Sequence, residues 1–360
     1  MILSRYLSRD ILQTTLAVCI VLLLIFLGGR FAGYLADAST GDLSPDVLMT
    51  LLFYRIPRIL ERVLPISLFL GILLVFGRLY VDNEISVLNA SGVSLPQLLL
   101  ASSGAIIFVA LLVAALTFYV APDSFQRTEQ LLNQEKNRSE LDLMKAGQFL
   151  PLRNSGGVIY SGSFAEDHSI MQDVFITRQA KNGNWVIMRS STGHQQYVEA
   201  TDERYLVLED GYRYQLIPGN FVADRLQFSS LKQHLEPAAV QKARRFQYET
   251  LPTTTLLENS DSKSRAVLQW RISLLLLVPV VALIAVAMSR TTPRRGRYVK
   301  LLPAMLLYFA YMSSLDILRN RVAEGELSVV ASYIIAHMPF VLIGVAFLYW
   351  ENIVLWWRSR

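Results

Sequence analysis

An uncharged apolar run from Ile11 to Gly29 constrains the fold of this chain more than any other sequence feature. A helix needs about 20 mostly apolar residues to cross the hydrocarbon core of a bilayer, and this run has that length. Of the 360 residues, 52% are hydrophobic and 18% are charged, against about 25% charged in a typical soluble domain. An ordinary soluble enzyme, a disordered chain and a nucleic-acid-binding protein are therefore excluded, and we expect an integral membrane protein.

Five further segments have the length and hydropathy of membrane spans. The second is Val63 to Gly77, with an apolar pattern that begins near Leu48, and the third is best placed from Leu98 to Val120. The last three follow a long polar region, at Ile272–Ser289, about Leu301–Leu315 and Leu327–Trp350. The sequence thus predicts an α-helical membrane protein with six transmembrane helices.

Positively charged residues in the short loops predict the orientation, because they gather on the cytoplasmic side of a membrane. One set of loops holds ten of them: Arg5, Arg9, Arg78, Arg290, Arg294, Arg295, Arg297, Lys300, Arg358 and Arg360. The opposite set holds two, Arg319 and Arg321. Both termini are therefore expected to be cytoplasmic, with the polar region 123–264 on the far side. In a bacterium that side is the periplasm, and a secretory lumen is the alternative.

The polar region 123–264 changes its pattern part-way along. Residues 123–146 hold many charges and good helix formers, which predicts a short connecting helix ended by Gly147. Short segments rich in β-branched and aromatic residues follow, separated by turn-forming residues. The predicted strands are 157–164, 174–178, 185–189, 196–200, 204–208, 212–217 and 221–228, and the predicted turns are 154–157, 181–184, 209–211 and 218–220. This spacing predicts an inserted all-β domain, as a sandwich, jelly roll or barrel.

These patterns divide the chain into three parts. Residues 1–122 hold three spans and a short cytoplasmic helix at 79–90, residues 123–264 form the β domain, and residues 265–360 hold three more spans. The layout is symmetric about the β domain, but no convincing sequence repeat relates the two sets of spans.

The chain lacks the motifs of common catalytic sites. It has no Gly-Lys dipeptide, which excludes a phosphate-binding loop of the form GxxxxGK[ST], and it has no HExxH zinc motif. The four histidines are scattered, and the single cysteine, Cys19, lies in an apolar run. We therefore predict no catalytic residue, no metal site and no bound cofactor. Any hydrolysis of ATP, with its Mg²⁺, would belong to another polypeptide.

Six arginines stand near the outer ends of the predicted spans, where a charge is costly. They are Arg30, Arg55, Arg58, Arg62, Arg319 and Arg321. The spacing of Arg55, Arg58 and Arg62 places these three on one helical face. Because the planar guanidinium suits phosphate, we interpret the six as a cationic rim for an anionic, phosphate-bearing ligand. The alternatives are extension of the side chains to the lipid headgroups and internal pairing, such as that of Arg62 with Glu61 or a neighbouring helix.

The loop between spans two and three predicts a contact with a soluble partner. Its core, Leu79 to Ala90, has the pattern of a short amphipathic helix on the cytoplasmic side, ended by Gly92. One stripe of this helix holds Tyr80, Glu84, Val87 and Leu88. Such a helix fits a groove on a separate ATPase and would couple ATP hydrolysis to transport. A simple interfacial turn is the alternative.

Three sequence blocks carry a resemblance to a known family. They are RYLSRDIL near the N-terminus, LPISLFLGILLVFGRLYVDNEISVLNASGVS, and RRGRYVKLLPAMLLYF. They resemble the LptF/LptG permease family of lipopolysaccharide export, and the resemblance covers essentially the whole chain. The second block is the most specific, and the second and third are more similar to LptF than to LptG.

The resemblance implies a function, partners and a location. Such a protein is a permease subunit of an ABC transporter that extracts lipopolysaccharide from the bacterial inner membrane and passes it through periplasmic β-jellyroll domains. The implied partners are an LptG-type permease, an LptB-type ATPase dimer, LptC and LptA. Glu84 matches the carboxylate of the family's coupling helix, and Arg30 matches a basic position that faces lipid A phosphates.

Three other functions stay open. The permease of another ABC exporter, such as a lipoprotein-releasing system, also lacks its own ATPase but usually has four spans, so the number of spans distinguishes the two. A membrane-bound, lipid-modifying enzyme would need a cluster of acidic or histidine residues at one membrane face. A purely structural subunit of an assembly is the third.

Overall fold

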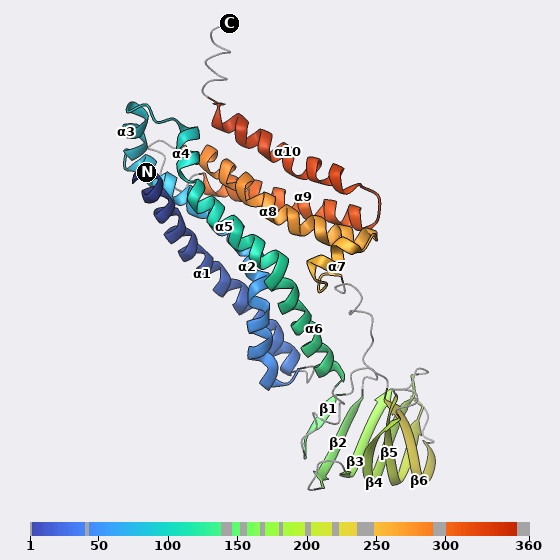
Figure 1. Cartoon of the computed structure of the whole chain (residues 1–360). Helices are drawn as coiled ribbons and strands as arrows, with labels where there is room; N and C mark the ends of the chain where they lie inside the picture. The colour runs from blue at the N-terminus through green and yellow to red at the C-terminus, as the bar shows by residue number, and fades with distance from the viewer. Residues whose placement is uncertain are drawn as a thin grey trace. The chain divides into compact units, whose positions relative to one another are not determined.

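The computed structural model describes residues 2–39, 43–137, 146–151, 157–165, 170–179, 183–198, 203–217, 223–235, 248–290 and 300–350. Contacts divide the chain into two compact units. One comprises Met1–Arg30, Leu52–Thr128 and Phe246–Arg360, and the other comprises Phe31–Leu51 and Glu129–Arg245. The first unit is built of helices, and the second holds a β-sheet (Figure 1).

Within these described ranges, six helical segments are long and apolar enough to cross a membrane, which confirms the six predicted spans. They are α1 (Ile2–Ser39); α2 (Leu48–Val81), after the 3-10 turn η1 (Pro45–Val47); α5 (Ser103–Ala115) with the π-helix η2 (Leu116–Val120) and α6 (Ala121–Asn137); α8 (Ser262–Met288); α9 (Leu301–Ala323); and α10 (Val329–Leu348). All but α10 extend beyond the predicted apolar segment, because the flanking polar residues continue the helix. The chain is a multi-pass membrane protein.

The predicted connecting helix 123–146 is not a separate element. The π-helix η2 joins α5 to α6 without a break, so the third span continues into charged residues as far as Asn137. Gly147 has a φ of +76° and donates its N–H to the carbonyl of Ser161 (2.9 Å), so it belongs to the start of the sheet. Residues 138–145 lie outside the described ranges.

The return from the sheet to the membrane also differs from the predicted boundary at residue 264. A short helix, α7 (Thr253–Glu258), precedes α8 and buries Leu256. Because α7 packs against α8, the segment from Phe246 onward belongs to the helical unit. The polar composition of this segment concealed that contact, since Leu256 is the buried residue that α7 contributes.

The prediction of one cytoplasmic helix over 79–90 is wrong. α2 continues to Val81, and α3 (Glu84–Ala90) begins after a two-residue turn. Asn83 in this turn has a φ of +62°, a left-handed conformation that asparagine tolerates better than most residues and that interrupts the helix. Gly92 ends α3 as predicted, with a φ of +86°. The chain then continues through α4 (Leu95–Ala101) into α5.

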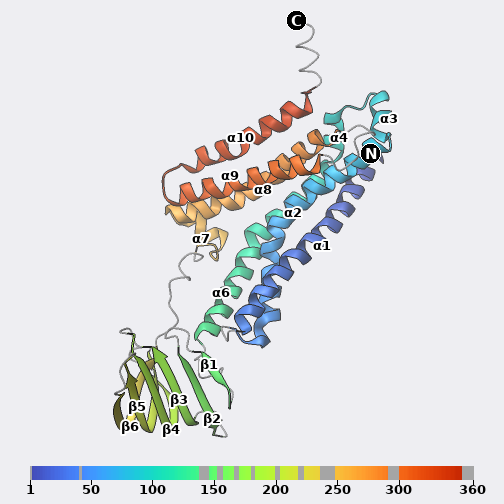
Figure 2. The same ribbon diagram turned by 180° about the vertical axis from the view of Figure 1, so that it is seen from behind.

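α8 is the central helix of the helical unit and packs against α5, α9 and α10 (Figures 1 and 2). The contacts of α10 with α8 and α9 include buried polar side chains as well as apolar ones. The amide of Gln269 donates to the hydroxyl of Ser332 (2.9 Å), and Nδ1 of His337 lies 2.5 Å from the hydroxyl of Tyr311 on α9. His337 is therefore a packing residue that holds helices together.

α1 and α2 pack closely at Gly71. A Cβ atom at this position would lie 2.5 Å from Oγ1 of Thr15 and 3.1 Å from its backbone nitrogen. We therefore expect Gly71→Ala to push the two helices apart and to lower the free energy of unfolding by about 1–3 kcal/mol. Gly28→Ala is the matched control, because no atom lies within 4 Å of a Cβ at Gly28. Thermal unfolding of the purified full chain measures both, and equal midpoints would contradict the close packing.

The second unit holds one antiparallel sheet of six strands, which confirms the all-β character of the insert. The strands are β1 (Phe149–Pro151), β2 (Val158–Phe164), β3 (Ile170–Gln179), β4 (Trp185–Val198), β5 (Glu203–Leu216) and β6 (Ala223–Leu235). Each strand pairs with its neighbours in sequence, in the order β1-β2-β3-β4-β5-β6. The topology is therefore a meander.

Two pairs of predicted strands are continuous in the structure. Residues 185–189 and 196–198 of the predicted 196–200 are both in β4, and residues 204–208 and 212–216 of the predicted 212–217 are both in β5. Residues 199 and 200 lie outside the described ranges. The predicted turn at 209–211 is wrong, since β5 continues through it and pairs with β4 and β6 on either side. Asp210 does have the positive φ (+52°) that its turn-like sequence suggests. The predicted turns at 154–157, 181–184 and 218–220 lie wholly or partly outside the described residues.

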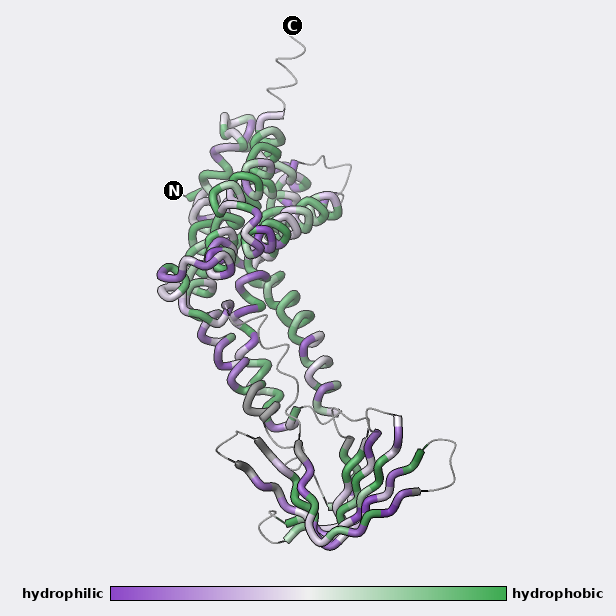
Figure 3. Tube along the Cα trace, turned by 90° about the vertical axis from the view of Figure 1, so that its right-hand side faces the viewer, coloured by the Kyte–Doolittle hydropathy of each residue, from purple (hydrophilic) through white to green (hydrophobic). Residues whose placement is uncertain are grey.

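A crease crosses the sheet at the row of residues that contains Asp210. Asp173 in β3 and Asp210 in β5 both have a positive φ, and the strand register places them in one row with Gly162 of β2. The sheet bends there, so that its two halves form the arms of a V (Figure 3). Both halves contribute to one apolar core: Ile159, Met171, Val174, Ile176, Val186, Met188, Leu206, Leu208 and Phe228. The bend thus lets the two halves of one meander sheet enclose a single apolar core, and the strand order is that of a meander rather than of the predicted sandwich, jelly roll or barrel.

Candidate functional site

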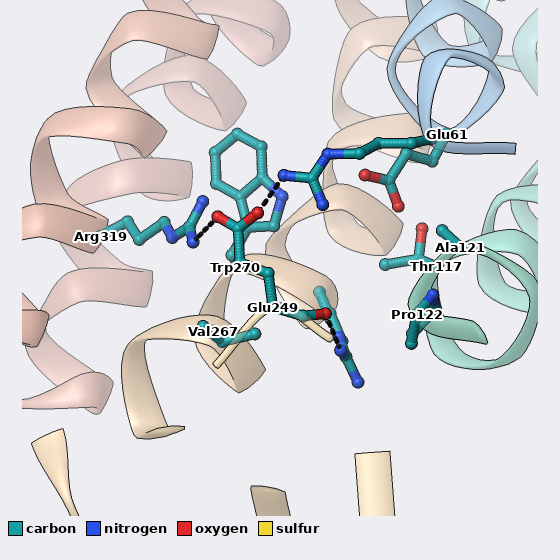
Figure 4. A pocket seen from close by; sticks show the side chains of 10 residues that line it. Glu61, Thr117, Ala121, Pro122, Glu249, Val267, Trp270 and Arg319 are labelled. Carbon is teal, nitrogen blue, oxygen red and sulfur yellow. Dashed lines mark hydrogen bonds and ion pairs between the residues drawn. The ribbon is translucent and has the colours of Figure 1, made fainter. Parts of the chain in front are cut away.

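Charged side chains from four segments of the helical unit meet in one pocket (Figure 4). Arg58 and Glu61 come from α2, Arg271 from α8 and Arg319 from α9, while Glu249 lies on the segment before α7. These five residues, together with Arg62 on the next turn of α2, are called the charge cluster below. Less polar residues complete the pocket wall: Thr117, Ala121, Pro122, Val267 and Trp270.

The carboxylate of Glu249 links two helices. It forms ion pairs with Arg58 on α2 and with Arg319 on α9, one through each oxygen. Burial raises the pKa of the Glu249 carboxyl, but the two guanidinium groups lower it by more, so that the pKa lies below its ordinary value. Glu249 is therefore ionised at neutral pH and joins α2 to α9.

Arg271 fixes the backbone of the same segment. Its guanidinium donates hydrogen bonds to the carbonyls of Glu249 (3.1 Å) and Leu251 (2.8 Å) and to the hydroxyl of Thr253 (2.7 Å). The residue is 4% exposed, and these acceptors engage its fork of donors. Arg271 therefore anchors residues 249–253 to α8.

A proline in α6 explains how Thr253 is held. Pro122 has no N–H, so it cannot donate to the carbonyl of Phe118 in the preceding turn. The hydroxyl of Thr253 donates to that carbonyl instead, at 2.8 Å. The π-helix η2 lies at this point, as such irregular turns often do beside functional sites. The third span, the returning segment and α8 are thus joined through Thr253 and Arg271.

Two buried aromatic rings hold the arginines by cation–π contacts. The guanidinium groups of Arg62 and Arg319 lie 5.2 and 5.3 Å from the ring centre of Trp270. Those of Arg55 and Arg58 lie 5.5 and 4.3 Å from the ring centre of Phe125. Each ring therefore positions two cations, independently of the ion pairs with Glu249.

The charge cluster has more cations than anions. It contains four guanidinium groups and two carboxyl groups, with the exposed Asp316 close enough to attract Arg62. Within the described ranges, Arg62 makes no ion pair, and its side chain is exposed. The arrangement suits an anion that offers several oxygen acceptors. The same ranges contain no group of three or more His, Cys, Asp and Glu side chains that could hold a metal ion.

The structure brings together part of the predicted cationic rim. Arg58, Arg62 and Arg319 lie in the charge cluster, and Arg55 shares the Phe125 ring with Arg58. Arg30 is exposed on α1, and Arg321 is exposed and paired with Glu326 (2.6 Å); neither makes any of the described contacts of the cluster. A role of the six arginines in anion binding stays a prediction.

Sequence reasoning missed three members of the site: Trp270, Arg271 and Glu249. Trp270 and Arg271 directly precede the predicted fourth span, and a charge followed by a long apolar run is itself a signal of a functional or paired residue. Glu249 had no such signal, because it lies among other polar residues. Internal pairing does occur, but the partner of Arg58 and Arg319 is Glu249 rather than Glu61.

The predicted stripe for a soluble partner is divided by the structure. Glu84 is exposed on α3 and accepts a hydrogen bond from the hydroxyl of Tyr6 (3.3 Å), and Val87 is also exposed. Tyr80, on α2, and Leu88 pack against the helical core instead. α3 is thus anchored on one side and presents Glu84 and Val87 to its surroundings on the other.

Comparisons with known proteins agree with this architecture. The family described as "Lipopolysaccharide export system permease LptF/LptG" matches residues 5–350. Proteins named "Lipopolysaccharide export system permease protein LptF" from Escherichia coli (strain K12) and Shigella flexneri are each 27% identical to this chain over 358 residues. The alignments cover 98% of this chain and 96% of each relative. A family match of this extent leads to one conclusion: the chain belongs to the LptF/LptG family of lipopolysaccharide export system permeases.

Proposed function

We propose that this chain is the LptF-type permease subunit of an ABC transporter that extracts lipopolysaccharide from the bacterial inner membrane. The family supports this function, and the charge cluster with its surplus of guanidinium groups is the structural observation that carries it. The chain is a transporter subunit. Hydrolysis of ATP, with its Mg²⁺, is supplied by an LptB-type ATPase dimer, and this chain holds no cofactor of its own.

The chemistry of the substrate explains the two surfaces that the protein needs. Acyl chains need an apolar surface, and apolar side chains such as Leu24, Leu306 and Leu342 are exposed on the spans. Phosphate groups need cations, which the charge cluster provides. An LptG-type permease would close the cavity around the acyl chains. The β domain would then receive the lipid and pass it to LptC and LptA.

Energy reaches the membrane through α3 in this proposal. Glu84 and Val87 enter a groove of the ATPase, while the buried side chain of Ile85 ties α3 to the helical core. Closure of the ATPase dimer on ATP would therefore move α3 and α2 together. Arg58, Glu61 and Arg62 of the charge cluster lie on the same helix, α2, so this motion reaches the proposed phosphate site.

Removing the exposed cation of the cluster tests the function directly. We expect Arg62→Gln to reduce photo-crosslinking of the full chain to lipopolysaccharide about tenfold, since one charge-assisted hydrogen bond is worth about 1.5–3 kcal/mol. Arg127→Gln is the control, because Arg127 is an exposed arginine that pairs with Asp123 (3.0 Å) outside the cluster. An unchanged crosslink in Arg62→Gln would remove the phosphate role of the cluster.

Reporter fusions test the proposed orientation. A reporter fused at Gly183, before β4, is expected to show a periplasmic location. A reporter fused at Gly296, which lies outside the described residues, is expected to show a cytoplasmic location. The physical reason is the excess of Arg and Lys in the second of these loops. The reverse pattern of activities would show that the termini are periplasmic.

A lipoprotein-releasing permease is the competing proposal. Such permeases usually have four spans, whereas the described part of this chain has six candidate spans. The match to the lipopolysaccharide permease family over residues 5–350 also favours lipopolysaccharide. Mass spectrometry of the lipid that co-purifies with the chain and its ATPase would decide between the two.

A further inference from the structure

We propose that Glu249 is an internal substitute for the ligand's phosphate. Its carboxylate occupies the place between Arg58 and Arg319 that a phosphate group takes, and the ligand binds by displacing it. This inference rests on the proposed function and deepens it. In the ligand-free protein, the anion site is therefore occupied by one of the protein's own side chains.

The geometry of the two ion pairs supports the substitution. Oε2 of Glu249 accepts from Nη2 of Arg58, and Oε1 accepts from Nη2 of Arg319. The carboxylate therefore bridges a cation on α2 and a cation on α9, one oxygen to each. A phosphate group offers the same arrangement of anionic oxygens, with one more to spare, and guanidinium groups bind both chemistries.

The site would stay in place after Glu249 leaves it. Arg58 rests on the ring of Phe125 (4.3 Å), and Arg319 rests on that of Trp270 (5.3 Å). Neither contact involves Glu249, so both guanidinium groups keep their positions for an incoming anion. The side chains of Arg58, Glu249 and Arg319 are 20%, 11% and 17% exposed, so the ion pairs are partly open to a ligand.

The backbone of Glu249 is held separately from its side chain. Arg271 donates to the carbonyls of Glu249 and Leu251, and these bonds do not use the Glu249 carboxylate. The carboxylate can therefore leave the arginines by side-chain rotation alone, while the segment stays on α8. Because Arg271 anchors the segment to α8 without using the Glu249 carboxylate, the segment would stay in place when the carboxylate leaves Arg58 and Arg319. This is the observation that favours displacement over a fixed structural pair.

Neutralising Glu249 gives the test. The full-length chain in phosphatidylcholine nanodiscs is titrated with fluorescent lipopolysaccharide and, separately, with inorganic phosphate. If the competing carboxylate leaves about one protein in ten free to bind, Glu249→Gln should bind about tenfold more tightly than the wild type. Glu326→Gln is the matched control, since Glu326 is an exposed carboxylate paired with Arg321 (2.6 Å), and its affinity should equal that of the wild type.

The outcomes separate this inference from the proposed function. Binding by the wild type with equal or weaker binding by Glu249→Gln would overturn the inference alone. No binding of lipopolysaccharide by any form would overturn both. Tighter binding of both probes would assign the site to phosphate groups in general, and tighter binding of lipopolysaccharide alone would assign it to a lipid-borne phosphate; either result supports displacement.

A second variant keeps the test valid if Glu249→Gln does not fold. Glu249→Asp retains the charge but shortens its reach by one methylene, so it weakens the competing ion pairs without leaving the arginines unpaired. We expect Glu249→Asp to bind lipopolysaccharide more tightly than the wild type. An affinity equal to or below that of the wild type would contradict displacement.

Discussion

Replacement of Arg271 by leucine is expected to destabilise this protein more than any other single substitution at the charge cluster. Leucine leaves the carbonyls of Glu249 and Leu251 without the donor that they have in the structure. It also removes the partner of Thr253, which joins this segment to the third span. Loss of one member of a buried charged network costs about 3–5 kcal/mol. Thermal unfolding of the purified full chain measures the loss.

Two further variants serve as comparisons for Arg271→Leu. Arg271→Lys keeps the charge but cannot reproduce the fork of donors, so a smaller loss is expected. Arg265→Leu removes an exposed arginine of the same helix, which donates to the carbonyl of Ser260 (2.7 Å), and should change stability by about 0.5 kcal/mol or less. If Arg271→Leu unfolded at the same temperature as Arg265→Leu, Arg271 would not anchor the returning segment.

Glu84→Ala is expected to abolish most of the recruitment of the ATPase. Glu84 is exposed, and in the proposed complex its carboxylate enters the ATPase groove. Removing one partner of an interfacial charge pair costs about 2–5 kcal/mol, which lowers co-purification of the ATPase by more than about tenfold. Because α3 is held to the core by Ile85, the fold of the variant should be unaffected. Quantitative pull-down with the ATPase measures the effect.

Ser86→Ala is the control on the same helix, since Ser86 is also exposed but carries no charge. It should retain the ATPase at the level of the wild type. Normal assembly and normal ATP-driven release of lipid by Glu84→Ala would count against α3 as the coupling element. A fall in the unfolding temperature of Glu84→Ala would instead point to its bond with Tyr6 as a structural contact.

Features that depend on local sequence were predictable. The uncharged run in α1 is long enough to cross a bilayer as a helix, and a helix satisfies its own backbone hydrogen bonds there. Alternating β-branched and aromatic residues likewise predicted strands. The bounds of β5 were not predictable, because Asp210 and Gly211 have the composition of a turn, while the neighbouring strands on both sides keep them in the sheet.

Part of the site was predictable for the same reason. The spacing of Arg58 and Arg62 places both on one face of α2, one turn apart, and their cost in a membrane marks them as paired or functional. Their aromatic and acidic partners were not predictable. Trp270 and Glu249 lie far along the chain, and only the packing of α8 and α9 on α2 brings them to these arginines.

The amino-acid sequence by itself determined that this protein crosses a membrane six times and carries an all-β insert, because span length and strand alternation are properties of short segments. The tertiary structure alone decided which arginines are held by Glu249, which one is exposed, and where the sheet bends. Those outcomes depend on contacts between distant segments, such as Arg58 and Glu249, 191 positions apart. No local pattern specifies such a pair, since many glutamates are available to each arginine until the helices pack.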